Sequence, residues 1–332
     1  MALTYIIFDL EWNQPYAHDI GFMKRTGVPI AGEIIQIGAI KLNAALEEVD
    51  RFMVFVKPEF LKHMHKHVAD LTNITQRDLE KGLAFRHAYE TFDEWCGEDA
   101  VLLSWGSDDI MMLADNLLLH RIKGGIRRPW FDAQRIFAYE RHGDAKQYSL
   151  QSAMEELAVD GGDLAAHDAL HDAIFTARIC AHLKLAYHVE HYEAIVSKDK
   201  GPIFFPDPTA FFVYEGFIDK NTILDVGKVK SAFCPKCGAR LRVRTPERIG
   251  GDRYLSIGTC ATHGAFALHW RIGKYMLRNF GARYCVSKML FESTERLERL
   301  YEDKKEINRL KAERYKRKLG LMKAGKDGRD GT

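Results

Sequence analysis

Four acidic side chains stand beside apolar segments of the sequence, where lone carboxylates would be costly. Asp9 and Glu11 end the apolar run Leu3–Phe8 as an Asp-x-Glu pair. In a strand, residues i and i+2 point to the same face, so the two carboxylates would repel one another unless a cation neutralised them. Asp109 follows the short apolar segment AVLLSWG, and Asp172 falls near the start of a later helical segment. Oxygen ligands from separate elements predict a site for two Mg²⁺ or Mn²⁺ ions.

This set of side chains suits the hydrolysis of a phosphodiester bond. The reaction needs an activated water and relief of the charge on the leaving oxygen, and two metals ~3.5–4 Å apart can serve both. An imidazole can accept the proton of that water near neutral pH. His167, five residues before Asp172, is the candidate base. For the Asp9 and Glu11 pair taken alone, the simpler interpretation is that the strand ends there and both acids are solvated.

A second cluster of potential ligands lies in the last third of the chain. Cys234 and Cys237 form one C-x-x-C pair, and Cys260 and His263 form a C-x-x-H pair 22 residues later. Two pairs at this spacing predict one structural Zn²⁺ in a zinc-ribbon-like module, with a hairpin between the pairs. A redox Cys-x-x-Cys is the alternative for the first pair, and His269 is a rival fourth ligand at poorer spacing.

The pattern of strands and helices expected around these residues predicts an α/β fold. Strands are expected at Leu3–Phe8, Glu33–Leu42, Val49–Lys57, Ala100–Ser104 and Pro129–Phe131. Helices are expected at Ala84–Cys96, Ile110–Arg121 and Leu150–Leu157, from Ala133 onward, and as one long helix from Ala165 to about Val189. Strands first and mixed elements later predict a mixed five-stranded sheet flanked by helices.

Three segments carry a resemblance to a known family. IIFDLEWN, WGSDDIMML and HDALHD resemble, in order, the three motifs of the DEDDh 3′–5′ exonucleases. The intervening EIIQIGAIKL, LTNITQRDL, FDAQRI and YSLQSAMEEL also follow the order of that family. The similarity covers roughly residues 3–187 and is greatest to the ERI-type ribonucleases, through the WG-x-x-D form of the second motif. The resemblance implies a ribonuclease H-like fold.

The resemblance also implies a role for each matching residue. Asp9, Glu11 and Asp172 match the ligands of the first metal, and Asp9 and Asp109 match those of the second. His167 matches the general base that deprotonates the attacking water. Because all five positions are filled, the sequence argues against an inactive copy of the fold.

Two positions have a neighbouring rival. Asp109 is preferred to Asp108 because an apolar pair follows it in the register of the family, whereas Asp108 stands where ERI-type members often have Trp. The His-x-Ala-x-x-Asp pattern selects His167 over His171. We expect His171 and Asp168 on the surface of the helix.

The charge is divided unevenly along the chain. Residues 1–230 hold 24 Lys and Arg against 35 Asp and Glu, whereas residues 231–332 hold 24 against 11. A basic tail on an acidic body suggests nucleic acid as the partner, and a solvated basic surface is the alternative. Basic residues interleaved with aromatics suit single strands, which makes Arg240, Arg242, Arg244 and Trp270 candidate substrate contacts. Trp12 is a further candidate for base stacking, or else a core aromatic at the sheet edge.

We therefore expect an exonuclease domain at 1–190, an aromatic-rich linker at 191–230, a zinc-ribbon-like module at 231–275 and a basic helical tail at 276–332. Leucines at 297, 300 and 310 of that tail could pack on the body, or on a second copy or another protein. Apolar residues make up 46% and charged residues 28%, as in ordinary soluble proteins. No apolar run reaches the ~18–20 residues of a membrane span. The absence of an export signal predicts a cytoplasmic location.

Together these features predict a metal-dependent 3′–5′ exonuclease of single-stranded nucleic acid, with RNA favoured. Two alternatives stay open at this point. One is a DNA-directed exonuclease, and the other is a catalytically inactive nucleic-acid-binding protein on the same fold.

Overall fold

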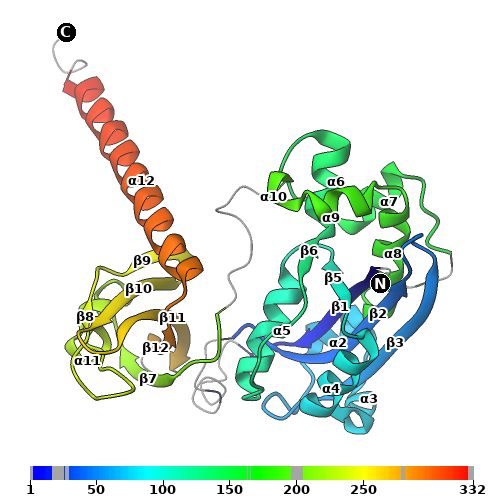
Figure 1. The fold of residues 1–332 in the computed structure, drawn as a ribbon, viewed down its shortest axis with the longest axis horizontal. Coiled ribbons are helices and arrows are strands. Elements are labelled where there is room, and N and C mark those ends of the chain that lie inside the picture. The colour runs from blue at the N-terminus through cyan, green and yellow to red at the C-terminus, as the bar shows by residue number, and fades with distance from the viewer. Residues whose placement is uncertain are drawn as a thin grey trace. The chain divides into compact units, whose positions relative to one another are not determined.

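The computed structural model describes residues 3–16, 26, 30–162, 164, 166–195, 205–277 and 281–327 (Figure 1). The chain divides into two compact units. The first comprises Met1–Thr26 and Ile30–Phe205, and the second comprises Gly27–Pro29 and Pro206–Thr332. Each unit is described separately below.

The first unit contains a mixed sheet with the strand order β4-β3-β2-β1-β5-β6. Its strands are β1 (Thr4–Asn13), β2 (Glu33–Leu42), β3 (Glu48–Lys57), β4 (Leu83–Ala84), β5 (Ala100–Ser104) and β6 (Trp130–Asp132). β1, β2 and β3 are antiparallel neighbours, whereas β5 runs parallel to β1 and β6 parallel to β5. The predicted mixed α/β sheet is confirmed. It has six strands rather than five in the described part of the chain, because the short β4 pairs with the end of β3.

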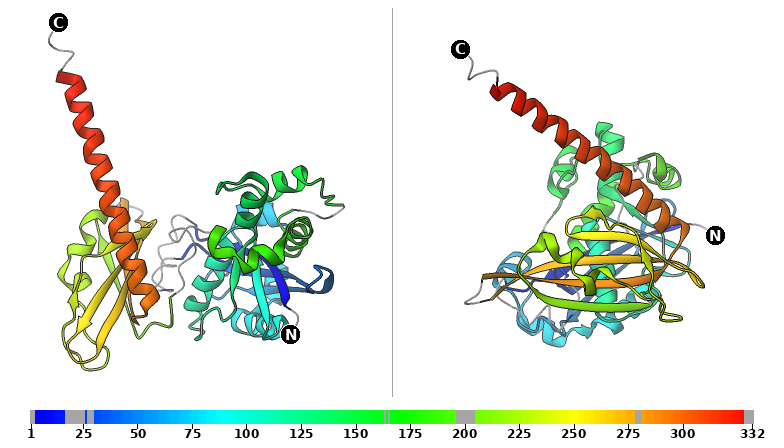
Figure 2. Two further views of the ribbon diagram at one scale, coloured as in Figure 1. Left: turned by 45° about the horizontal axis from the view of Figure 1, so that its top comes forward. Right: turned by 90° about the vertical axis from the view of Figure 1, so that its left-hand side faces the viewer.

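Helices cover both faces of this sheet (Figures 1 and 2). Their bounds are α2 (Lys66–Thr72), α3 (Gln76–Lys81), α4 (Phe85–Cys96), α5 (Asp108–Leu119), α6 (Ala133–His142), α7 (Leu150–Glu156), α8 (Ala169–Ala181), α9 (Leu185–Glu190) and α10 (Tyr192–Ile195). Side chains of β1 alternate between two cores, as the two-residue period of a strand requires. Tyr5 and Ile7 pack with residues of α6, α7 and α8, whereas Ile6 and Phe8 pack with residues of α4 and α5.

The single long helix expected after Ala165 is wrong. Residue 165 lies outside the described residues, and α8 begins only at Ala169, where the Asp168 side chain accepts the backbone N–H groups of Leu170 and His171. α8 ends at Ala181, and the chain starts again as α9 after Lys184. The backbone N–H of Lys184 donates to Glu140 of α6 at 2.9 Å, which fixes the break between the helices.

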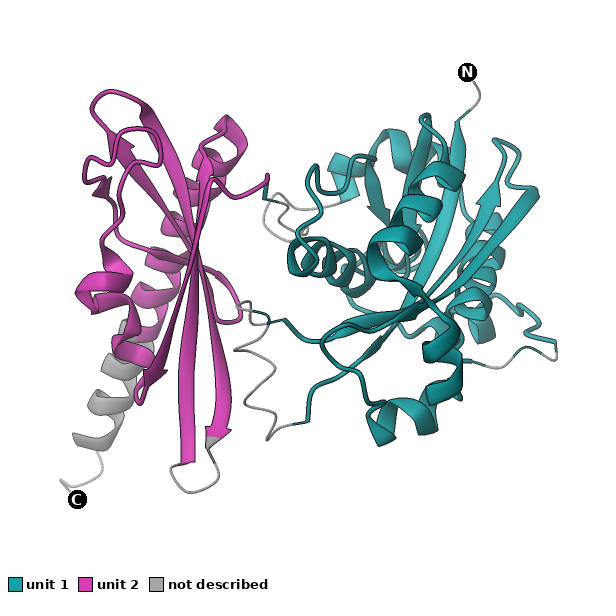
Figure 3. Cartoon of the chain, turned by 90° about the horizontal axis from the view of Figure 1, so that it is seen from below, with its two compact units in different colours: residues 1–26, 30–205 teal, residues 27–29, 206–332 magenta. Residues whose placement is uncertain are grey.

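The second unit, magenta in Figure 3, is built on an antiparallel sheet. The strand order is β7-β12-β11-β10-β8, and β9 also pairs with β10. The elements are β7 (Ala210–Phe217), the 3₁₀ helix η1 (Lys220–Asp225), α11 (Gly227–Lys230), β8 (Arg242–Val243), β9 (Glu247–Gly250), β10 (Arg253–Cys260), β11 (Gly264–Leu277), β12 (Gly281–Glu292) and α12 (Glu295–Asp327). One face of the sheet holds a core that includes Trp270, Leu268 and Val286.

The expected boundaries at 191, 231 and 276 differ from these units. β7 lies within the predicted linker, yet it pairs with β12, and its Ala210 and Tyr214 pack against the core of the second unit. β12 lies within the predicted helical tail. The aromatic segments at 210–217 and 281–292 are therefore strands of one sheet, and the predicted ribbon module is part of this larger unit.

Helix α12 is anchored to its own unit by its first turns. Leu297 and Tyr301 are buried, and the Tyr301 hydroxyl donates to the carbonyl of Thr245 at 3.0 Å. Part of the predicted leucine repeat thus packs within the unit, whereas Leu310 is exposed and the helix continues beyond the sheet (Figure 2). No helix in the described part of the chain is long and apolar enough to cross a membrane.

Candidate active site and cysteine cluster

Asp9 and Glu11 lie near the end of β1 on one face of the sheet. Strand alternation places them on the face that also carries Tyr5 and Ile7. The pairing register with β2 shifts between Glu11 and Trp12, so an irregularity in the ladder directly follows the acidic pair. Such irregularities redirect side chains and are frequent beside active sites.

Asp109 reaches the same place from the first turn of α5. Because β5 is parallel to β1, the helix that follows β5 begins at the sheet edge where β1 ends. The Asp109 side chain is only 6% exposed, and its Oδ1 accepts the backbone N–H of Leu10 at 3.2 Å. The neighbouring Asp108 is exposed. The geometry therefore favours Asp109, as the sequence pattern does.

α8 brings the remaining residues over β2. Gly38 of β2 is the register partner of Asp9, and a Cβ built there would lie 2.1 Å from the backbone nitrogen of Leu170. Only a residue without a side chain allows this approach of helix to sheet. The start of α8 is held further by Gln36, whose Nε2 donates to Asp168 Oδ2 at 3.0 Å and whose Oε1 accepts the Ala169 N–H at 3.2 Å.

His167 and Asp172 meet Glu11 at the start of α8. His167 adopts φ 62°, a left-handed conformation that is uncommon for a non-glycine residue. Its backbone N–H donates to Asp172 Oδ2 at 3.3 Å, and its side chain is exposed. One ligand atom each from Glu11, His167 and Asp172 lies within 4.8 Å of the others. The structure thus brings together residues that are up to 161 positions apart in the sequence.

Charge is concentrated at this site. Burial raises the pKa of Asp9 well above its ordinary value, and the charges of Asp109 and Asp172 raise it further. Burial and the charge of Asp172 raise the pKa of Glu11 to about 8. Burial likewise raises the pKa of Asp109 and of Asp172. Holding these carboxylates together is unfavourable, because burial and mutual repulsion oppose their charged forms. Bound cations would offset the repulsion and restore the charged forms.

Asp168 is more than a helix-surface residue, so the expectation is wrong for Asp168, whereas His171 is a partly exposed residue of α8. Asp168 caps α8, is held by Gln36, and its charge contributes to the raised pKa values of Asp9 and Glu11. The His171 ring lies 3.9 Å from Asp168 Oδ1. Sequence reasoning missed Gln36 because a single amide in an apolar strand gives no signal until its partner across the fold is known.

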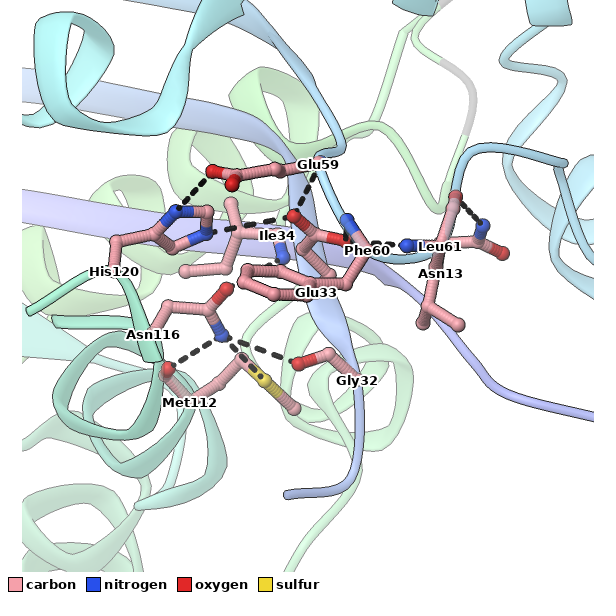
Figure 4. A network of polar contacts seen from close by, with 10 residues as sticks. All are labelled: Asn13, Gly32, Glu33, Ile34, Glu59, Phe60, Leu61, Met112, Asn116 and His120. Carbon is pink, nitrogen blue, oxygen red and sulfur yellow. Dashed lines mark hydrogen bonds and ion pairs between the residues drawn. The ribbon is translucent and has the colours of Figure 1, made fainter. Parts of the chain in front are cut away.

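A polar network ties the ends of β1, β2 and α5 together (Figure 4). Glu33 at the start of β2 accepts the backbone N–H groups of residues 59, 60 and 61 at 2.6, 2.9 and 2.7 Å. Asn116 of α5 accepts the Ile34 N–H at 3.0 Å, and Asn13 of β1 donates to the Leu61 carbonyl at 3.0 Å. The Asn116 bond fixes α5, and with it Asp109, against β2, the neighbour of the strand that carries Asp9 and Glu11.

The predicted substrate contacts have different outcomes. Trp270 is 0% exposed and donates its Nε1–H to the Val229 carbonyl, so it is a core residue and cannot stack on a base. Trp12 is half-buried and packs beside the core formed with α4 and α5. Arg244 is paired with Glu302 of α12 at 2.6 Å. Arg240 and Arg242 are exposed.

The four predicted soft ligands converge in the second unit. One ligand atom each from Cys234, Cys237, Cys260 and His263 lies within 4.8 Å of the others. Cys234 Sγ is 3.5 Å from His263 Nδ1, and Cys237 Sγ is 3.7 Å from Cys260 Sγ. Hydrogen bonds from the backbones of Thr262 and His263 lower the pKa of Cys260 to about 6, which favours the thiolate. His269, the rival ligand, lies outside this cluster and is buried within β11.

Comparisons with known proteins agree with this geometry. Residues 6–180 match the Exonuclease (RNase_T) family model. The "Probable 3′-5′ exonuclease KapD" of Bacillus subtilis (strain 168) is 28% identical over 204 residues, which cover 60% of this chain and 90% of that protein.

Two solved structures are among those to which the chain is similar. The nuclease domain of 3′hExo, described as a DEDDh family member bound to rAMP, has a TM-score of 0.47 and 24% identity over 57% of this chain and 92% of that one. A 3′-exonuclease described in 3′-end specific recognition of histone mRNA stem-loop has a TM-score of 0.45 and 22% identity. That match covers 55% of this chain and 64% of the other, which is less than two thirds of its length.

The fold and the site define a nuclease with a mixed α/β sheet, whose acidic residues lie at the carboxyl end of β1. The chain belongs to the Exonuclease (RNase_T) family and is similar to a probable 3′–5′ exonuclease.

Proposed function

We propose that this chain is a metal-dependent exoribonuclease that removes nucleotides from the 3′ ends of single-stranded RNA. The observation that carries the proposal is the convergence of Asp9, Glu11, Asp109 and Asp172, whose pKa values are all raised. Carboxylates that repel one another across separate elements are costly to keep unless cations bind there. This supports an active enzyme over an inactive binding protein on the same fold.

The donor set fits two Mg²⁺ or Mn²⁺ ions, because every side chain of the acidic cluster offers oxygen. Glu11 and Asp172 would hold one ion, Asp109 the other, and Asp9 both. When bound, the ions would stabilise the charge on the attacking and leaving oxygens of the phosphodiester. The chain itself keeps the four carboxylates in place: Leu10 donates to Asp109, and the His167 backbone donates to Asp172.

His167 is proposed as the general base. Its exposed imidazole is free to meet water, and its ring lies beside Glu11 and Asp172. The left-handed backbone of His167 and the cap at Asp168 set the direction of this side chain. The imidazole would take the proton of the attacking water and pass it to solvent. General-base catalysis of this kind raises the rate by about 10²–10⁴-fold.

RNA is favoured over DNA because the second motif, Trp105-Gly106-Ser107-Asp108-Asp109, resembles the form found in ERI-type ribonucleases. The test uses 5′-labelled RNA and DNA of identical sequence, single-stranded and duplex, with Mg²⁺ or Mn²⁺. We expect a ladder of products that shorten from the 3′ end, with a higher kcat/KM on single-stranded RNA. Equal or faster cleavage of DNA would overturn the RNA preference, and metal binding without cleavage of any oligomer would overturn the exonuclease proposal.

We also propose that Cys234, Cys237, Cys260 and His263 hold one structural Zn²⁺. A tetrahedron with Zn–S bonds of ~2.3 Å has S–S edges of about 3.8 Å, close to the 3.7 Å between Cys237 and Cys260. Four protein ligands leave no open position, so the ion would act by joining the knuckle at 234–238 to the end of β10. The lowered pKa of Cys260 supplies the thiolate that such a site needs.

A further inference from the structure

The second unit presents an exposed aromatic ring beside two arginines. Phe233 is 57% exposed, although it precedes the buried Cys234. Phe233 and Arg240 form an antiparallel bridge, and Arg242 pairs with Thr259 of β10. We call the surface formed by Phe233, Arg240 and Arg242 the arginine–phenylalanine face.

Backbone pairing sets the direction of these three side chains. Cys234 donates its N–H to the Ala239 carbonyl, and Leu241 donates to the Ala232 carbonyl, each at 2.8 Å. Ala232 and Leu241 are buried in the core of the unit. Strand alternation therefore turns Phe233, Arg240 and Arg242 together toward solvent. The ring of Phe233 is thus open to solvent on the same side of the hairpin as two cationic side chains.

The segment of the chain that carries this face is basic. Residues 226–246 contain six Lys and Arg and no Asp or Glu. Lys236 is paired with Glu292 at 2.7 Å, and Arg244 with Glu302 at 2.6 Å. Within the described residues, the guanidinium groups of Arg240 and Arg242 are exposed and form no hydrogen bond or ion pair. Two unneutralised guanidinium groups thus flank the exposed ring.

We propose that the arginine–phenylalanine face binds single-stranded nucleic acid, with one base stacked on Phe233 and two phosphates bound by Arg240 and Arg242. An aromatic ring accepts the face of any base, and guanidinium groups pair with phosphate in a bidentate manner. The inference rests on the proposed nuclease function, and it assigns to the second unit a substrate-holding site apart from the acidic site. Phe233 takes the stacking role that the sequence assigned to Trp270.

Binding is measured with full-length Asp9→Asn protein, which prevents cleavage, and a 5′-fluorescein-labelled 20-nucleotide RNA or the matching DNA. Fluorescence anisotropy gives Kd at several salt concentrations in the presence of Mg²⁺. The test variants are Phe233→Leu, which keeps an apolar side chain without a π face, and the pair Arg240→Gln with Arg242→Gln. Matched controls are Tyr139→Leu, an exposed aromatic of the first unit, and the exposed pair Arg77→Gln with Arg86→Gln.

The two test variants should differ in kind. Loss of stacking is worth about 5- to 100-fold in Kd, and Phe233→Leu should show it without changing the salt dependence. Loss of two phosphate contacts should lower the slope of log Kd against log salt by about 1.4, since each contact to a single strand contributes roughly 0.7. Phe233→Tyr should restore the affinity, and Arg240→Lys with Arg242→Lys should restore the slope.

Several outcomes would overturn the inference. Affinities within twofold of the parent for both test variants, or equal losses in the controls, would place the nucleic acid elsewhere. If the test variants weaken the binding of RNA and DNA alike, the face binds any single strand. If they weaken only the binding of RNA, the face selects RNA. Zinc content and melting temperature are compared for every variant. A variant that loses zinc is replaced by its conservative counterpart, Phe233→Tyr or the pair Arg240→Lys with Arg242→Lys. That counterpart must then bind RNA like the parent. RNA that the wild type binds through this face but never cuts would overturn the nuclease proposal and leave this inference intact.

Discussion

Asp9 and Gly38 face one another across the β1–β2 ladder, and the first turn of α8 lies directly on Gly38. The absence of a side chain at Gly38 is therefore what lets a helix bring Asp172 and His167 over the acidic end of β1. This contact, together with the hydrogen bonds of Gln36 to Asp168 and Ala169, sets the distance between the strand and the helix that carry the site.

Gly38→Ala should remove most of the activity. The new Cβ would lie 2.1 Å from the Leu170 nitrogen and 2.2 Å from the Ala169 carbonyl carbon, so α8 must move away from β2. Overpacking of this kind costs about 1–3 kcal/mol or more, and the displaced Asp172 should also weaken Mg²⁺ binding. Melting temperature, kcat and the Mg²⁺ concentration for half-maximal rate are measured together. Gly227→Ala, where a Cβ meets nothing within 4 Å, is the control and should be near neutral.

Gln36→Leu should lower kcat because the start of α8 loses its support, and not because Gln36 takes part in the reaction. The buried amide holds both the Asp168 carboxylate and the Ala169 N–H, and its loss leaves Asp168 without one donor. A lost partner of a buried polar group costs roughly 1–3 kcal/mol. We expect the required Mg²⁺ concentration to rise and kcat to fall about 10-fold, while the pH profile of kcat keeps its shape. Gln151→Leu on the exposed face of α7 should change neither quantity.

The sequence predicted that the four acids would lie close together, because strand alternation and the order of the motifs could be read without knowing the fold. It could not find Gln36, because its partners Asp168 and Ala169 are more than 130 positions away. The cap at Asp168 is local, and it was missed because the helix was expected to begin at Ala165. Trp270 was misassigned for a related reason. Its basic neighbours suggested a surface, but the register of β11 points Trp270 into the core. The fold of the second unit was missed because the pairing of β7 with β12 joins segments about 70 residues apart.

His167→Ala should reduce kcat by about 10²–10⁴-fold while leaving Mg²⁺ binding nearly unchanged, because a general base assists proton transfer and is not needed to hold the carboxylates. His171→Ala is the matched control, since its ring contacts Asp168 and lies outside the group formed by Glu11, His167 and Asp172. Its loss should cost less than 10-fold. If His171→Ala were the more damaging change in kcat, the assignment of the base would be wrong.

Without added Mg²⁺, the protein should lose stability as pH rises. The pKa of Glu11 rises from 4.5 to about 8 in the folded state, so the folded protein binds this proton more tightly than the unfolded chain. The resulting stabilisation is complete below about pH 4.5 and is lost as the pH rises through 8.

Glu11→Gln should reduce this loss of stability between pH 5 and 8 by roughly 3–4 kcal/mol, since the raised pKa acts over about 2.5 pH units of this range and one unit corresponds to about 1.4 kcal/mol. Urea unfolding at several pH values measures it, with the exposed Glu80→Gln as control. Adding Mg²⁺ to the wild type should restore the stability at pH 8, because the ions favour the charged carboxylates. A wild type whose stability rises steadily from pH 5 to 8 without Mg²⁺ would contradict the raised pKa of Glu11.

The protein as purified should contain one zinc ion per chain. Cys234→Ser or Cys237→Ser should release it and unfold the second unit, because structural zinc contributes about 10–16 kcal/mol to the folding of such modules. The acidic site lies in the first unit, so cleavage of very short oligomers should persist. Elemental analysis and limited proteolysis measure the two effects. Cys285→Ala, a buried cysteine of the same unit outside the cluster, should keep its zinc. A redox Cys-x-x-Cys would behave differently: fresh protein would lack zinc, and dithiothreitol would raise its count of reactive thiols by two.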